Sequence, residues 1–183
     1  WNKGIKKARG EIILFTESDA QLPSNWIEEM VDHLKINDFI LGPETRPTEP
    51  NNSMSNVGIK ANLAKNHLFD ESFRIGEDTK WIIDLQVNGI RPNYPLTPIV
   101  WHYKVKSFKK RLKREFLGGI KIVQIWLEYD DVIKNTTYNF KQISAISNTL
   151  SGIANFIGIL FGLILYSYQL PKKILRIFRN IIG

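Results

Sequence analysis

The sequence contains no cysteine, which excludes a disulfide framework, a thiolate zinc site and a cysteine nucleophile. Any metal must therefore take oxygen or imidazole ligands, and a reducing compartment is the natural expectation. The chain also lacks internal repeats and a glycine-rich phosphate loop, and it starts at Trp1 without an initiator methionine, so we expect a piece of a longer protein. Hydrophobic residues make up 43% and charged residues 23% of the 183 positions, which excludes intrinsic disorder.

Positive charge is concentrated in two short blocks. Residues 1 to 103 carry 11 basic and 14 acidic side chains, whereas residues 104 to 121 carry eight basic side chains against Glu115 alone, and the tail from Pro171 adds four. Between the blocks, the 29 residues from Gln142 to Leu170 contain no Asp, Glu, Lys or Arg. That length suffices to cross a hydrocarbon core, which needs about 20 helical residues.

This uncharged stretch predicts a membrane-associated helix. A buried helix of a soluble core is the alternative, but such helices usually run only about 10 to 14 apolar residues. Gly158 and Gly162 also favour a membrane helix, because glycine is commoner there than in soluble helices. The basic tail beyond Pro171 favours the cytoplasmic side. We therefore predict that residues 143 to 170 form a bent, re-entrant or partly interfacial helix that returns the tail to cytoplasmic headgroups. The polar residues ahead of Gly158 and Gly162 suit such a bend; they are Ser147, Asn148, Thr149, Ser151 and Asn155.

The first hundred residues show an α/β pattern. The apolar run from Glu11 to Thr16 predicts a strand of the kind buried on both faces in a parallel sheet. A polar turn follows, and then a helix over residues 25 to 36 with Ser24 as its N-cap. The apolar positions of this helix have helical spacing; they are Ile27, Met30, Val31 and Leu34.

Further elements are predicted along the rest of the chain. A short strand is expected over residues 39 to 41, an irregular loop over 42 to 56, and a strand passing into a helical turn over 57 to 68. A helix opens at Gly76 and ends at Gly89, and its inward positions are Trp81, Ile82 and Leu85. Short extended segments are expected over 90 to 94 and 98 to 103, and a long basic amphipathic helix over 107 to 127.

Two acidic clusters stand where α/β folds build ligand sites. Glu17 and Asp19 follow the first strand, and two carboxylates in one turn can bind a divalent cation together with substrate phosphates. A solvated acidic turn is the alternative. Glu77 and Asp78 open the helix after Gly76. One of these carboxylates could act as a general base, or both could simply stabilise the helix dipole, and the sequence is consistent with either role.

The surroundings of these acids make the pattern more specific. The run from Asn2 through Gly10-Glu11-Ile12-Ile13-Leu14-Phe15-Thr16-Glu17-Ser18-Asp19-Ala20 resembles the central block of family 2 glycosyltransferases. Phe69-Asp70-Glu71-Ser72-Phe73, Gly76-Glu77-Asp78-Thr79, Gly89 and Trp101-His102 resemble the second block, in the same order and at suitable spacing. The resemblance covers about residues 1 to 120. It implies an α/β GT-A (Rossmann-like) fold, here a partial domain without its N-terminal nucleotide-binding portion.

The resemblance also implies an activity and a set of roles. The activity is inverting transfer from a nucleotide-diphosphate sugar, assisted by Mg²⁺ or Mn²⁺. Asp19 matches the last acid of the family's metal motif, while Glu17 stands where the family usually has Asp. Asp78 matches the catalytic base and Glu77 a positioning group, and Lys80 departs from the family at a place that is often acidic or neutral. His102 is a candidate third metal ligand, with a solvated strand-end histidine as the alternative.

Arg111 and Arg114 complete the candidate site, because guanidinium groups fit the oxygens of a diphosphate. A solvated or lipid-facing basic face is the alternative. The processive synthases of the family carry a Gln-x-x-Arg-Trp motif that the chain lacks, which disfavours a polymerase. We expect three parts: a partial catalytic domain over 1–106, a basic amphipathic helix and connector over 107–141, and a membrane-associated helix and tail over 142–183.

These expectations define one function and leave two alternatives. The enzyme would sit on the cell membrane with its catalytic part facing the cytoplasm, and its acceptor would be lipid-linked or a glycan. A non-catalytic membrane scaffold remains possible in principle. So does a basic module for anionic surfaces; nucleic acid is not expected as the partner, because no aromatic platform accompanies the basic residues.

Overall fold

The computed structural model describes residues 1–44, 54–73, 76–102, 107–129 and 150–166. The chain forms two compact units, Trp1–Lys104 and Val105–Gly183. The predicted boundary between residues 141 and 142 falls outside the described residues and stays a prediction.

The first unit is built on a three-stranded sheet with the order β1 (Ile12–Phe15), β4 (Val57–Lys60), β3 (Phe39–Leu41). β4 lies in the middle and is antiparallel to both neighbours, with Leu14 and Ile40 each opposite Gly58. The prediction of a purely parallel environment for β1 is therefore wrong. β1 and β3 do run in the same direction, as a strand–helix–strand unit requires, but β4 returns through a loop and inserts between them.

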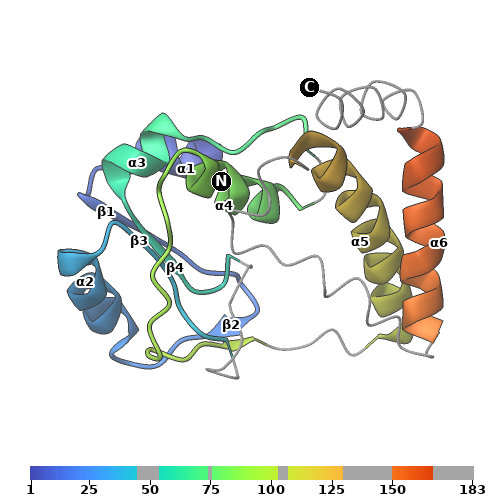
Figure 1. The fold of residues 1–183 in the computed structure, drawn as a ribbon. Coiled ribbons are helices and arrows are strands. Elements are labelled where there is room, and N and C mark those ends of the chain that lie inside the picture. The colour runs from blue at the N-terminus through green and yellow to red at the C-terminus, as the bar shows by residue number, and fades with distance from the viewer. Residues whose placement is uncertain (45–53, 74–75, 103–106, 130–149, 167–183) are drawn as a thin grey trace, which may run out of the picture. The chain divides into compact units, whose positions relative to one another are not determined.

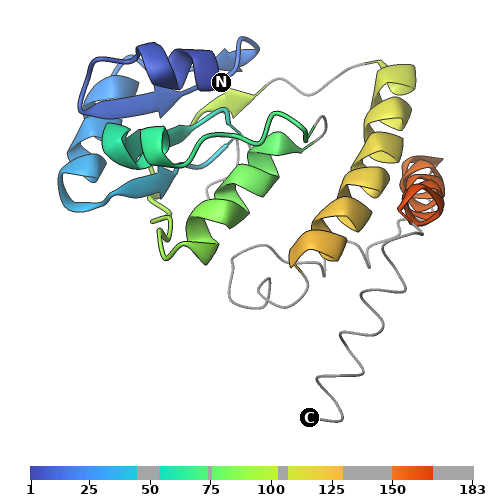
Figure 2. The same ribbon diagram turned by 90° about the horizontal axis from the view of Figure 1, so that it is seen from above.

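Helices cover both faces of this sheet (Figures 1 and 2). On one face α1 (Asn2–Lys7), α3 (Ala61–Asn66) and α4 (Glu77–Val87) join the core around Phe15, Phe39 and Ile59. On the other face α2 (Trp26–Ile36) buries its apolar side against Ile40. A Cβ on Gly58 would lie 2.8 Å from Leu34 Cδ1, so glycine at the centre of the sheet allows α2 to approach closely.

Helix α2 forms where it was predicted, and Met30 and Leu34 are buried as expected. It begins at Trp26 with Asn25, not Ser24, as the N-cap. Ile27, predicted to face inward, is 64% exposed, whereas Trp26 is buried. The indole Nε1 of Trp26 donates to Asn56 Oδ1 at 2.9 Å, so the larger ring gains both burial and a partner for its polar atom.

The elements β3, β4, α3 and α4 agree with the predictions, whereas α1 was not predicted and a short strand, Ala20–Gln21, lies in the segment predicted as a polar turn. The segment from Val57 forms a strand and then the short helix α3, and α4 begins at Glu77 with Trp81, Ile82 and Leu85 buried. Gly89 has φ +83° directly after the C-cap residue Asn88, a backbone conformation that favours glycine. A second, two-stranded sheet pairs β2 (Ala20–Gln21) antiparallel with β5 (Trp101–His102).

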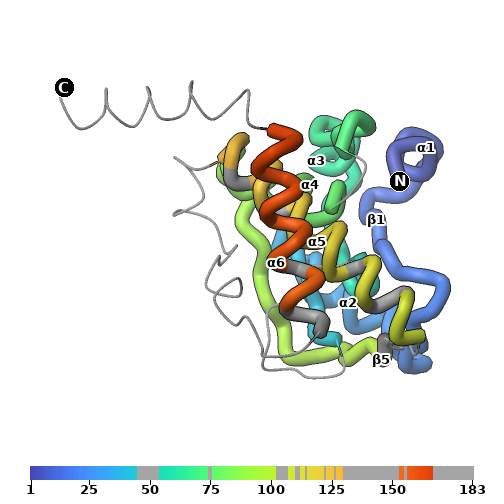
Figure 3. The backbone as a smooth tube through the Cα atoms, turned by 90° about the vertical axis from the view of Figure 1, so that its right-hand side faces the viewer, coloured from blue at the N-terminus to red at the C-terminus, as the bar shows by residue number. Residues whose placement is uncertain are grey.

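The second unit contains α5 (Phe108–Tyr129) and α6 (Leu150–Leu165), which lie side by side (Figures 1 and 3). A Cβ on Gly158 would lie 2.0 Å from the carbonyl oxygen of Phe116, so the helices can pack this closely only with glycine there. α6 continues unbroken through Gly158 and Gly162. Gly158 and Gly162 therefore serve helix packing. A bend before Leu150, ahead of these glycines, falls outside the described residues and stays a prediction.

The described part of α6 covers 16 residues. Among the described residues, no helix combines the length and the apolar character needed to cross a membrane.

Candidate functional site

The first acidic cluster lies in a tight turn between the two sheets. The N–H of Ala20 donates to the carbonyl of Glu17 at 3.1 Å, so Glu17 and Asp19 occupy one turn between β1 and β2. Glu17 is half-buried, with its Oε2 shielded from solvent, whereas Asp19 is exposed. The turn therefore presents one accessible carboxylate and one that is partly withdrawn.

The strand register brings the third predicted metal ligand to the same place. Ala20, the residue after Asp19, pairs with His102 across the β2–β5 ladder. This pairing places the backbone of His102 next to the turn, although the direction of its side chain lies outside the description.

The donors at this turn fit a divalent cation that shares its ligands with a substrate. Mg²⁺ is usually held by one or two carboxylates plus phosphate oxygens and water, and Glu17 and Asp19 supply two carboxylates. The hydroxyl of Thr16, just before the turn, is buried and finds no hydrogen-bond partner among the described residues. No cluster of three or more metal-ligating side chains occurs in the described part of the chain, so a cation here would depend on further oxygen ligands.

The second acidic cluster opens α4. Gly76 has φ +71° at the N-cap position, and the N–H of Lys80 donates to its carbonyl at 2.9 Å to close the first helical turn. Asp78 Oδ1 accepts the N–H of Thr79 at 2.6 Å and the hydroxyl of Thr79 at 3.3 Å. These bonds fix the position of the Asp78 carboxylate in the first turn of α4.

The two motif blocks are physically joined through Asn2. Its Nδ2 donates to the carbonyl of Phe69 at 2.8 Å and to Glu71 Oε1 at 2.9 Å, and its Oδ1 accepts the N–H of Phe69 at 2.8 Å. The ring of Phe69 stacks on Trp81 of α4 with centroids 4.6 Å apart. The start of the first block thus fixes the Phe69 segment, which in turn packs on the helix that carries Glu77 and Asp78.

A pocket of about 460 Å³ lies beside this junction. Its lining combines aromatic rings, carboxylates and one lysine, from Trp1, Asn2, Lys3, Phe69, Asp70, Glu71, Phe73 and Glu77. Glu77 faces this pocket, whereas Asp78, Glu17 and Asp19 are not among the lining residues. Of the two acids at the start of α4, Glu77 therefore faces the pocket, whereas Asp78 is bonded to Thr79 and does not line the pocket.

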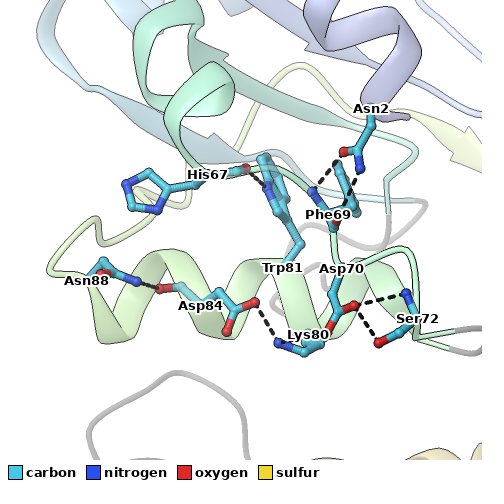
Figure 4. A network of polar contacts seen from close by, with 9 residues as sticks. All are labelled: Asn2, His67, Phe69, Asp70, Ser72, Lys80, Trp81, Asp84 and Asn88. Atoms are coloured by element: carbon cyan, nitrogen blue, oxygen red, sulfur yellow. Dashed lines mark hydrogen bonds and ion pairs between the residues drawn. The ribbon is translucent and has the colours of Figure 1, made fainter.

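Sequence reasoning missed an ion-pair network beneath the pocket (Figure 4). Lys80 lies 2.9 Å from Asp84 Oδ2 and 3.7 Å from Asp70 Oδ2. The hydroxyl and N–H of Ser72 both donate to Asp70 Oδ1 and hold the pKa of the Asp70 carboxyl below its ordinary value of 3.8, and Lys80 acts in the same direction. The Lys80–Asp84 pair could have been predicted from the sequence, because the two residues have the i, i+4 spacing of neighbours on one helix face. The Lys80–Asp70 pair has no such local signal.

Arg111 and Arg114 lie near the start of α5 in the second unit. Their side chains are outside the described residues, and the two units are described separately. Their predicted contact with a diphosphate therefore stays a prediction.

Comparison with known proteins finds one family for the first unit. The model of the family described as Glycosyl transferase family 2 matches residues 1–84. No curated protein matches the chain. The family match over residues 1–84 confirms the resemblance indicated by the motifs. The matched segment contains Glu17, Asp19, Glu77 and Asp78 and ends before His102, Arg111 and Arg114.

Proposed function

We propose that the first unit is the catalytic part of an inverting glycosyltransferase with a GT-A fold. Its donor is a nucleotide-diphosphate sugar, and its acceptor is a lipid-linked molecule or a glycan. The observation that carries the proposal is the junction of both motif blocks in one unit, with Asp78 held at the N-terminus of α4. The family match over the same residues supports it.

In this proposal Asp78 is the general base. The acceptor oxygen attacks the anomeric carbon as the bond from that carbon to the diphosphate oxygen breaks on the opposite face, and Asp78 takes the proton of the acceptor hydroxyl. Glu77, one position earlier, orients the acceptor by accepting hydrogen bonds from its hydroxyl groups.

The turn after β1 serves the donor. Glu17 and Asp19 would hold the cation, with His102 as a further candidate ligand. When bound, Mg²⁺ or Mn²⁺ would offset the negative charge that accumulates on the departing diphosphate. Arg111 and Arg114 are proposed to contact the diphosphate oxygens directly.

The variant Asp78→Asn tests the proposal, because it removes the proton acceptor and keeps the shape of the side chain. We expect transfer in the full-length protein to fall by about 10²- to 10⁴-fold, the usual contribution of a general base, while donor affinity changes little. The assay follows radioactive sugar from UDP-glucose, UDP-N-acetylglucosamine, UDP-galactose or GDP-mannose into a membrane extract that supplies acceptors.

Asp32→Asn is the matched control, because Asp32 is an exposed helical carboxylate on α2 paired with Lys35. It should leave transfer unchanged. Activity of Asp78→Asn within severalfold of wild type would show that Asp78 is not the base. Absence of both transfer and donor binding in the wild type would instead favour the non-catalytic scaffold.

We also propose that the second unit attaches the enzyme to the cytoplasmic face of the cell membrane. The described part of α6 contains no charged residue, and several of its large apolar side chains are about half exposed: Ile153, Phe156, Ile157, Leu160, Phe161, Ile164 and Leu165. Exposed apolar surface of this extent requires a partner. The exposed Lys109 and Lys113 of α5 suit anionic headgroups.

Flotation with lipid vesicles tests this attachment. The wild type should float with vesicles containing phosphatidylglycerol and less with pure phosphatidylcholine, since basic residues near the surface contribute about 1 kcal/mol each toward anionic lipid. Ile157→Glu should weaken binding to both, because it places a charge on the exposed apolar side of α6. Ile36→Glu on α2, at an 85% exposed position, is the control. Equal flotation of Ile157→Glu and wild type would contradict attachment through α6.

A further inference from the structure

Lys80 is a buried cation in α4, whose other buried residues are mostly apolar apart from Thr79 and Gln86. It is 6% exposed and lies between Thr79 and Trp81, which are also buried. Its ammonium contacts Asp84 on the next turn of α4 at 2.9 Å and Asp70, outside the helix, at 3.7 Å (Figure 4). The ammonium also lies 6.0 Å from the centroid of the Phe73 ring. Lys80 therefore connects α4 to both ends of the segment Asp70–Phe73.

This segment belongs to the loop Phe69–Phe73, which forms part of the pocket wall. Phe69, Asp70, Glu71 and Phe73 all line the pocket, together with Glu77 from α4. The loop is closed on itself by the bonds from Ser72 to Asp70 and by the N–H of Phe73, which donates to the carbonyl of Asp70 at 3.1 Å. The position of Asp70 therefore determines the position of the whole turn.

Stability alone is a poor explanation for this arrangement. Withdrawing an ammonium from water opposes folding, and replacing a buried ion pair with apolar residues of similar volume is often neutral or stabilising. An apolar residue at position 80 would fill the same space without that cost, as its buried neighbours Trp81 and Ile82 do. A cation here is useful because it fixes the direction of two carboxylates at once.

We propose that Lys80 is a positioning residue that holds the Phe69–Phe73 loop against the first turn of α4. The pocket wall and the turn carrying Glu77 and Asp78 then keep one geometry before any substrate arrives. The inference rests on the proposed function, because it assigns this pocket to the acceptor, the substrate whose hydroxyl must reach the base.

Hydrogen exchange tests the positioning role without depending on catalysis. In Lys80→Met, the amides of residues 70–73 of the full-length protein should exchange at least tenfold faster than in the wild type. Lys80→Arg, which keeps the charge, should restore most of the protection. Lys35→Met is the matched control, because Lys35 forms an exposed ion pair with Asp32 on α2, and it should leave this segment unchanged.

Asp70→Asn keeps the test decisive if Lys80→Met fails to fold. Asp70 is a partly exposed side chain, and Asn retains an oxygen that can accept from Ser72 while it removes the ion pair with Lys80. Exchange in residues 70–73 should again rise. Exchange within twofold of wild type in Asp70→Asn, and in Lys80→Met where it folds, would overturn the proposal.

Transfer kinetics separate the role in the reaction from the proposed function. With the same labelled donors and a membrane lipid extract as acceptor, Lys80→Met should raise the apparent KM for the extract at least fivefold and leave the KM for the donor unchanged. Normal kinetics in a variant with a loosened loop would refute the acceptor role. If the wild type shows no transfer, but residues 70–73 exchange faster in Lys80→Met as expected, the proposed function is refuted. The role of Lys80 in positioning the loop would still be supported.

Discussion

The hydrogen bonds of Asn2 make a quantitative prediction about what holds the two motif blocks together. Asn2 is 8% exposed, and its amide binds both backbone groups of the buried Phe69. In Asn2→Ala, the N–H and the carbonyl of Phe69 lose these partners, and each buried group left unsatisfied costs about 1 to 3 kcal/mol. The bond to Glu71 adds little, because that side chain is exposed and water replaces the amide.

We therefore expect Asn2→Ala to lower the free energy of unfolding by about 2 to 6 kcal/mol, which is a large part of the stability of a typical domain, about 5 to 15 kcal/mol. Urea unfolding of the full-length protein, followed by tryptophan fluorescence, should show a lower midpoint with an unchanged slope. Asn62→Ala, at an exposed position in α3, should be neutral or slightly stabilising. A loss below about 0.5 kcal/mol in Asn2→Ala, the net value of an ordinary hydrogen bond at its lower limit, would refute the reasoning.

Two further predictions concern carboxylates. Asp19→Ala should weaken donor binding in the presence of Mg²⁺ and make that binding less dependent on the cation, because it removes an accessible carboxylate from the turn. Isothermal titration with UDP-glucose and GDP-mannose, with and without Mg²⁺, checks this prediction. Unchanged affinities would place the cation elsewhere. Because the folded state lowers the pKa of Asp70 below 3.8, its contribution to stability is fully present above that value and is lost as the pH falls through the lower native value. Asp70→Asn should thus be less stable than wild type at pH 7, and the difference should shrink toward about pH 2.5 in urea unfolding; a difference independent of pH would contradict an ionised Asp70 in the native state.

The elements with local signals were predictable from the sequence. The apolar run at β1 and the helical spacing in α4 of the first unit and in α5 of the second each lie within one segment, and each gives the expected element. The place of β4 between β1 and β3 has no such signal, because strand pairing joins residues more than forty positions apart, such as Leu14 and Gly58. The prediction that Ile27 faces inward is wrong for a similar reason, since the partner of the buried Trp26 is Asn56 on another segment.

The candidate site shows the same division. The acids Asp19 and Asp78 were readable from the sequence, because each stands directly after a strand or at the start of a helix, where motifs are compact. The bond between Asn2 and Phe69 and the ion pair between Lys80 and Asp70 were not readable. Both depend on how α1, the loop Phe69–Phe73 and α4 come together in the fold.

The residues that carry the family resemblance are therefore of two kinds: some hold the fold together, and others are proposed to take part in the reaction. The contacts in the structure distinguish the two kinds. Asn2 belongs to the motif, yet its bonds go to the backbone of Phe69 and to Glu71, so its substitution should reduce activity by loosening the fold. Asp78 accepts a hydrogen bond from the N–H of its neighbour Thr79 in the first turn of α4, and an Asn side chain at this position can accept the same bond. Its substitution should remove activity while the free energy of unfolding changes little. Measuring unfolding and transfer on both variants distinguishes a residue that builds the site from one that performs the reaction.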